Sequence, residues 1–147
     1  MSSYLEMKEK HAKLLNSIPI QFAFSKKDLK EGLKRLGLLE TDTDKVVSLP
    51  GGGFMKKDDV PKYIDIQNQI QKEFWDAIDN DKEGTGFICD MFSYELENHE
   101  YVLTGDLEET LEALNLTPKD FKEHPNLKKG LDLAEKKLAN SDFDYTV

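Results

Sequence analysis

The sequence has only one cysteine and no long apolar run, and each of these features excludes a class of protein. Because Cys89 stands alone, no disulfide can form within the chain, which is usual in a reducing compartment. The longest apolar runs, such as Ile18 to Phe24, are much shorter than the roughly 20 residues that span a bilayer. The N-terminal residues mix charges where a secretory signal needs an apolar stretch. We therefore expect a cytoplasmic protein that does not bind a membrane.

The chain also lacks a catalytic motif, an internal repeat and a Gly/Ser-rich linker. Its 147 residues, 38% of them hydrophobic, suffice to bury about two-thirds of the unfolded surface in one core. We expect a single globular domain over residues 1–140. A frayed C-terminal tail, residues 141–147, should follow it.

Negative charge is concentrated in one part of the sequence. Residues 76–112 contain twelve acidic residues and one basic residue, a formal charge of −11, whereas the whole chain has −9. Clustered charge of one sign steers association with oppositely charged partners. Nucleic-acid binding needs basic side chains that neutralise phosphates, so we expect no direct contact with nucleic acid.

Apolar residues at helical spacing predict that most of the chain is helical. The predicted helices begin at Ser3, after the N-cap Ser25, after Asp58 or Asp59, at Phe87, after Asp106, after Thr117 and after Pro125. Residues 87–101 also alternate in part like a strand, and we favour a helix there. Gly37 should end the second helix, because glycine adopts the left-handed conformation of a helix C-terminus.

Two segments predict a small antiparallel sheet. Apolar runs flank the turn at Pro50 to Gly53, which is typical of a β-hairpin around residues 45–57. Residues 19–24 alternate large apolar side chains with smaller ones, as in a half-buried strand. The expected fold class is α+β, a single and mainly helical domain with a small antiparallel sheet.

The segment from Asp79 to Asp90 partly matches a calcium-binding loop. Asp79, Asp81 and Glu83 occupy the first, third and fifth ligand positions, and a glycine follows at the sixth. The second half departs from the pattern, because Gly86 replaces a branched apolar residue and Asp90 replaces the chelating glutamate. The alternative is a solvated turn between helices, in which an aspartate caps and a glycine has positive φ. Calcium is the one cofactor that the sequence suggests.

Two other motifs favour structural roles. The three glycines at 51–53 lack the following Lys-Ser or Lys-Thr of a nucleotide-binding loop, so they indicate a tight turn. Cys89, His99 and Tyr101 are the candidates for a small enzyme's site, but Cys89 and His99 would lie roughly 15 Å apart along one helix and could not pair there. A lone cysteine among apolar residues is typical of a core, and we predict no catalytic residue.

The acidic residues between 90 and 112 allow three interpretations. They can be the solvated faces of amphipathic helices, a docking surface for a basic protein, or a mimic of nucleic-acid phosphates. Each predicts salt dependence, because exposed charges are screened over ~8 Å at physiological ionic strength. The side chains expected in a docking surface are Glu95, Glu97, Glu100, Asp106, Glu108, Glu109 and Glu112.

Short motifs from Tyr4 to Leu138 resemble a group of uncharacterised small acidic proteins from Gram-positive gut bacteria, their phages and other mobile elements. The motifs are Phe22-Ala23-Phe24-Ser25, Gly51-Gly52-Gly53-Phe54, Gly86-Phe87-Ile88-Cys89-Asp90-Met91-Phe92, Tyr94-Glu95-Leu96, Asn98-His99-Glu100-Tyr101, Thr104-Gly105-Asp106 and Leu114-Asn115-Leu116-Thr117. The resemblance brings no known activity and no functional residue.

The resemblance favours a non-enzymatic interaction protein that binds a host or cognate protein with a basic patch, since small acidic proteins of phages often act in this way. Three alternatives stay open. They are an inhibitor or nucleic-acid mimic that binds a host nucleic-acid-binding protein, a calcium-binding module at residues 79–90, and a small enzyme with an unrecognised site.

Overall fold

The computed structural model describes the backbone of residues 3–98 and 107–145, and the side chains as far as residue 139. The chain forms two compact units. Unit 1 combines Met1–Lys8 with Lys72–Val147, and unit 2 is Glu9–Gln71. Helices α1 (Ser3–Asn16) and α3 (Val60–Asn80) each contribute to both units. The expected single domain over residues 1–140 stays a prediction.

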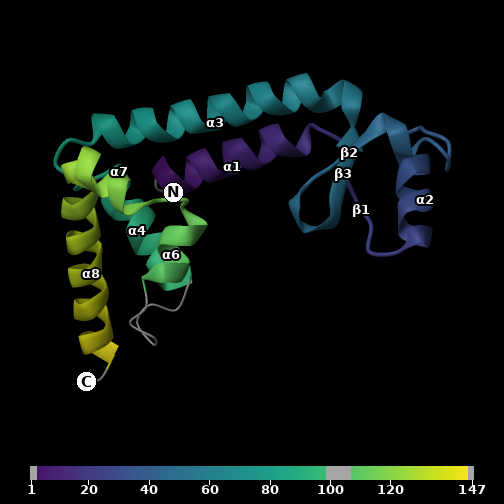
Figure 1. The fold of residues 1–147 in the computed structure, drawn as a ribbon. Coiled ribbons are helices and arrows are strands. Elements are labelled where there is room, and N and C mark those ends of the chain that lie inside the picture. The colour runs from purple at the N-terminus through teal and green to yellow at the C-terminus, as the bar shows by residue number, and fades with distance from the viewer. Residues whose placement is uncertain (1–2, 99–106, 146–147) are drawn as a thin grey trace. The chain divides into compact units, whose positions relative to one another are not determined.

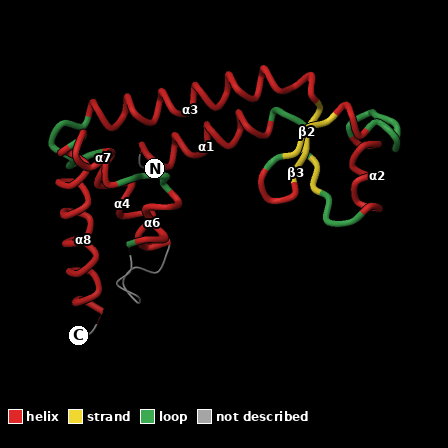
Figure 2. Tube along the Cα trace, in the orientation of Figure 1, coloured by secondary structure: helices red, strands yellow, loops and turns green. Residues whose placement is uncertain are grey.

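Unit 2 contains the sheet, and its strands confirm the predicted fold class. The strands are β1 (Gln21–Phe22), β2 (Val46–Ser48) and β3 (Gly53–Lys56). They pair antiparallel in the order β1-β3-β2, so the predicted hairpin places β3 in the centre. Figure 2 shows the strands in yellow. The strand predicted at 19–24 is shorter than expected, because only two of its residues pair with β3.

The sheet separates two apolar clusters in unit 2, because successive side chains of a strand point to opposite faces. Phe54 packs with Leu33 of α2 (Lys26–Arg35) and with Leu36, the residue after this helix, on one face. Met55, the next residue of β3, packs with Ile18 and with Ile66 of α3 on the other. Because its side chains alternate, β3 contributes to the apolar clusters on both faces of the sheet.

Local signals in the sequence fix both ends of α2. The Ser25 hydroxyl accepts a hydrogen bond from the N–H of Asp28 at 3.1 Å, and the Asp28 carboxylate accepts one from Phe24 at 3.2 Å. Gly37 ends the helix with φ of 79°, and its N–H donates to the carbonyl of Lys34. The predicted N-cap and the predicted C-terminal stop are therefore confirmed.

The glycines at 51–53 form the predicted tight turn. Short 3-10 turns cover Thr43–Lys45, Pro50–Gly52 and Lys57–Asp59. Gly51 and Gly52 have φ of 80° and 83°, values that side chains other than glycine rarely adopt. The carbonyl of Gly52 accepts a hydrogen bond from Ala23 at 3.0 Å, which extends the pairing of β3 with β1 beyond the short strand.

Unit 1 is helical in its described residues. Its helices are α4 (Phe87–Asn98), α6 (Glu108–Ala113), α7 (Pro118–Glu123) and α8 (Pro125–Tyr145), together with parts of α1 and α3. Figure 1 shows α8 running close to α4 and α7. Their apolar faces meet in one cluster, whose buried members are Tyr4, Ile78, Phe87, Ile88, Cys89, Met91, Phe92, Leu96, Leu116, Leu127, Leu131, Ala134 and Leu138.

Several predicted boundaries in unit 1 can be compared with the structure. The helix favoured over the strand at residues 87–101 is confirmed as far as Asn98, and the rest lies outside the described residues. The predicted cap Asp106 also lies outside the described residues. The structure places the N-cap of α6 at Leu107. Thr117 and Asp120 form a capping box with hydrogen bonds in both directions. Helix α8 continues to Tyr145 and includes most of the residues expected as a tail.

Two glycines let α8 approach the turn before α4. Gly84 has φ of 73°, and a Cβ there would lie 2.6 Å from the carbonyl oxygen of Asn126. A Cβ on Gly130 would clash with the Ile88 side chain and lie 2.9 Å from the carbonyl oxygen of Gly84. Among the described residues, no helix has the length and apolar character needed to cross a membrane.

Candidate binding surfaces

The turn between α3 and α4 uses an aspartate as a helix cap. The Asp81 carboxylate accepts hydrogen bonds from the N–H groups of Gly86 and Ile88 at 3.1 and 2.9 Å. These are N–H groups at the start of α4, where a negative charge is stabilising. Gly84 supplies the positive φ within the same turn. The interpretation as a capped turn is therefore confirmed for residues 80–86.

The other residues of the suggested calcium loop have different neighbours. Asp79 lies 3.1 Å from Nδ1 of His124, and Glu83 lies 3.8 Å from Nζ of Lys129. Asp90 is half-buried on α4. In the described parts of the chain, no three His, Cys, Asp or Glu side chains are arranged to hold a metal ion. Calcium binding here stays a prediction, which calorimetric titration with calcium would test.

Cys89 is a core residue, as its apolar neighbours in the sequence predict. Its side chain is fully buried, and its Sγ lies 3.9 Å from Oγ of Ser93 on the next turn of α4. His99 and Tyr101, the other members of the candidate enzyme site, lie outside the described residues. A buried thiol in an apolar cluster is poorly placed to attack a substrate.

Glu95 corrects one part of the predicted docking surface. The sequence predicted a solvated position for it, but its exposed fraction is only 3%. Its carboxylate accepts hydrogen bonds from the Tyr4 hydroxyl and, at 2.9 Å, from Nζ of Lys8. The prediction was wrong because both donors come from α1, and no local pattern in α4 reveals them. Glu95 fastens α4 to the first two turns of α1 and is not available to a partner.

The lysine that pairs with this buried carboxylate also lies near two aromatic rings. Nζ of Lys8 lies 5.6 Å from the ring centre of Tyr4 and 5.0 Å from that of Tyr94, within the range of cation–π attraction. Burial and the hydrogen bond to Glu95 raise the pKa of the Tyr4 hydroxyl above its ordinary value. The hydroxyl is therefore held in its protonated, donating form.

Four members of the predicted docking surface are exposed, and they define what we call the acidic face. They are Glu97 on α4 and Glu108, Glu109 and Glu112 on α6, two helices that contact each other. The remaining two, Glu100 and Asp106, lie outside the described residues.

The lysines of unit 1 do not neutralise most of the acidic face. Three of them pair with other carboxylates, in the pairs Lys72–Asp76, Lys119–Glu123 and Lys128–Asp132. Within the described parts of the chain, Glu97, Glu109 and Glu112 form no ion pair. No lysine of the described residues therefore neutralises these three carboxylates through an ion pair.

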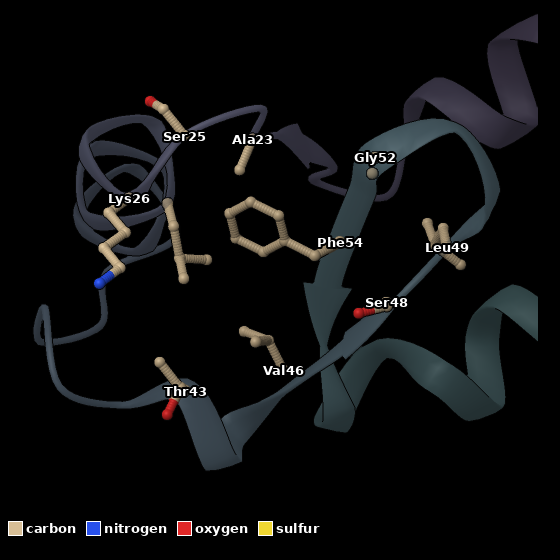
Figure 3. A pocket seen from close by; sticks show the side chains of 11 residues that line it. Ala23, Ser25, Lys26, Thr43, Val46, Ser48, Leu49, Gly52 and Phe54 are labelled. Atoms are coloured by element: carbon tan, nitrogen blue, oxygen red, sulfur yellow. The ribbon is translucent and has the colours of Figure 1, made fainter.

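Unit 2 contains a pocket of about 460 Å³ that the sequence did not predict. It lies between the sheet and the start of α2, and Figure 3 shows the side chains of Ala23, Val46 and Phe54 converging on it. Lys26 is the charged residue of its lining. No single stretch of sequence signals this pocket, because segments 23–29, 43–49 and 52–54 all contribute to it.

Two exposed aromatic side chains cover the glycine turn beside this pocket. Phe22 and Phe24 have exposed fractions of 59% and 79%. A Cβ on Gly52 would lie 2.7 Å from the Phe24 ring, and one on Gly53 would lie 3.2 Å from the Phe22 ring. The absence of side chains at these glycines thus lets the rings rest on the turn. An exposed aromatic in an alternating strand pattern was the available sequence signal for a surface here.

The geometry defines a mainly helical α+β protein with a small antiparallel sheet. Comparison with known families places it more closely. The chain belongs to a family of unknown function (DUF7659), whose model matches residues 3–137. This confirms the expected membership of an uncharacterised family. No curated protein and no solved structure matches the chain.

Proposed function

We propose that this chain is a non-enzymatic interaction protein that binds a basic partner protein through the acidic face. The observation that carries the proposal is the exposure of Glu97, Glu108, Glu109 and Glu112 on two adjoining helices, while Lys119 and Lys128 pair with other carboxylates. Opposite charges across an interface speed the encounter and align the partners. A host or cognate protein of a bacterium, phage or mobile element, with a basic patch, fits this surface.

The distribution of charge between the units supports this assignment. Unit 1 has nine basic and twenty acidic residues, a net charge of −11, whereas unit 2 has eleven basic and nine acidic residues, a net charge of +2. A basic partner is therefore attracted to unit 1 in particular. The attraction should weaken as salt is added, because exposed charges are screened over ~8 Å at physiological ionic strength.

Affinity capture with a charge-reversed variant tests the proposal. The variant carries Glu97→Lys, Glu108→Lys, Glu109→Lys and Glu112→Lys, and its folding is checked by circular dichroism. Proteins that the native chain captures and the variant loses are candidate partners, and each is purified and titrated directly. We expect the variant to bind at least about tenfold more weakly, since several rim charges reverse at once. A purified partner that binds both chains equally well would disprove the proposal.

Competition identifies the class of partner further. If the partner is a nucleic-acid-binding protein, duplex DNA or RNA should displace it from the native chain, because phosphates and the acidic face would occupy the same groove. A basic partner that is not displaced would still support docking on the acidic face, but not mimicry of nucleic acid.

A further inference from the structure

The pocket in unit 2 adjoins an edge of the sheet. In the order β1-β3-β2, strand β2 has a neighbour on one side only. Val46 and Ser48 of β2 also line the pocket. Their side chains project from the same face, because alternate residues of a strand share a face. The pocket and the edge can therefore be occupied together by one extended segment.

The register shows which backbone groups of this edge point outward. Leu49 donates to the carbonyl of Gly53 at 2.7 Å, and the hydrogen-bonded pairs of an antiparallel ladder alternate with non-bonded pairs. Val47 opposite Met55 is consequently a hydrogen-bonded pair, whereas Val46 and Ser48 turn their N–H and C=O groups away from β3. In the part of the chain that the structure describes, no hydrogen bond to these outward groups is present.

The charge at the pocket selects the sign of a ligand. Lys26 stands at the first position of α2 and is exposed, and Lys27 and Lys30 follow on the same helix. Lys26 forms no ion pair within the described residues. The other lining residues are neutral, and Leu29, Val46 and Phe54 make the floor apolar. An apolar side chain with a carboxylate near it is the complementary group.

We infer that the free edge of β2 and this pocket bind an extended, acidic segment of a partner protein. The segment adds a fourth strand beside β2 through the outward groups of Val46 and Ser48. One bulky apolar side chain of the segment enters the pocket, and an acidic side chain next to it lies by Lys26. This surface belongs to unit 2, whereas the acidic face belongs to unit 1, and the two surfaces attract partners of opposite charge.

Selection of peptides tests the inference even while the partner is unidentified. A library of short random peptides displayed on phage is selected against the full chain, and the consensus peptide is synthesised. We expect acidic residues beside an aromatic or branched apolar residue in the consensus. In NMR titration of the full chain, the amide protons of Val46 and Ser48 should shift downfield and exchange more slowly. Failure to select any peptide, or shifts that leave β2 unaffected, would overturn the inference.

Two matched variants test the charge and the strand pairing separately. Lys26→Glu should weaken binding of the consensus peptide about fivefold, as expected for one partly screened charge. Lys27→Glu, which makes the same charge change outside the pocket lining, should have a smaller effect. Equal losses in the two variants would contradict the placement of the carboxylate beside Lys26.

Ser48→Pro removes an outward N–H that β3 does not use, so it should abolish added-strand pairing while the hairpin persists. A consensus peptide with N-methyl groups at alternate positions tests the same bonds without altering the protein. Binding that survives both changes would exclude strand addition. If the peptide converts dimers of the chain to monomers, a second copy of the chain occupies the edge of β2. That result would also overturn the inference.

Discussion

The two units of this chain bury their apolar side chains in different arrangements. Unit 1 gathers its helices around one apolar cluster, and unit 2 places two smaller clusters on opposite faces of a short sheet. Unit 1 has a net charge of −11 and unit 2 a net charge of +2. The acidity of the protein is therefore a property of one unit, and a statement about its partners must say which unit they meet.

Each unit also depends on a glycine where a helix makes a close approach. In unit 1, Gly130 of α8 lies against Ile88 of α4, and the Gly84 carbonyl lies beside it. In unit 2, Gly32 of α2 lies against the Phe54 ring, where a Cβ would be 2.5 Å from the nearest ring carbon. The difference is that Gly130 meets backbone as well as side chain, while Gly32 meets side chains alone, namely the end of the Phe54 ring and the Cβ of Gln21.

Gly130→Ala should give the largest loss of stability. The added methyl group has no space between Ile88 and the Gly84 carbonyl, so α8 must move away from α4. We expect the free energy of unfolding, measured in urea, to fall by about 3 kcal/mol, the upper part of the range for overpacking. Gly86→Ala is the control, because its Cβ would have no neighbour closer than 3.7 Å. Similar losses in both variants would show that the contact is not tight.

Glu95→Ala should have the next largest effect. We expect the free energy of unfolding to fall by about 2 kcal/mol, because the Tyr4 hydroxyl and Lys8 would lose a buried acceptor. Lys8 is half exposed, which keeps the loss below that of a fully buried pair. Glu97→Ala, two residues further along α4 and exposed, should change stability by less than about 0.5 kcal/mol. If the two alanine variants are equally stable, the hydrogen bonds of Glu95 to Tyr4 and Lys8 do not stabilise the fold.

Gly32→Ala should cost about 1 kcal/mol, less than Gly130→Ala, because the Phe54 ring can shift to admit a methyl group. The NMR signals of Leu33 and Leu36, which share the cluster with Phe54, should move, and those of the unit 1 cluster should not. A loss larger than that of Gly130→Ala would reverse the ranking of the two glycines.

The smallest effect concerns Tyr4 and is limited to alkaline pH. Its raised pKa means that the folded chain keeps the hydroxyl proton above pH 10.0, whereas the unfolded chain releases it. The unfolded state then binds fewer protons, so stability should fall as the pH rises above that value. Tyr4→Phe should make this fall less steep in urea titrations at several pH values. An unchanged pH dependence would mean that Tyr4 ionises normally in the folded chain.

Local signals predicted much of the fold. Caps at Ser25 and Thr117, the stop at Gly37 and the hairpin turn are written in neighbouring residues, and the structure confirms each of them. The helical choice for residues 87–98 was also correct, because its apolar residues serve a buried helix.

The candidate sites depended on contacts between distant residues. Glu95 was misplaced because Tyr4 and Lys8, which bury and bind it, belong to α1. The pocket went unpredicted because it forms only when α2 lies over a sheet whose strands are far apart in sequence. Exposure itself is a tertiary property, so charge counts located the acidic region without showing which carboxylates face water.

The location of the charge can be tested most directly with two variants of equal net charge. One reverses the acidic face, with lysine at Glu97, Glu108, Glu109 and Glu112. The other reverses four exposed carboxylates of unit 2, namely Glu31, Asp44, Asp58 and Asp65. The dissociation constant of each for a captured basic partner is measured by calorimetry at low and physiological salt. We predict that only the first variant loses binding, whereas equal losses would show that net charge, and not the acidic face, governs association.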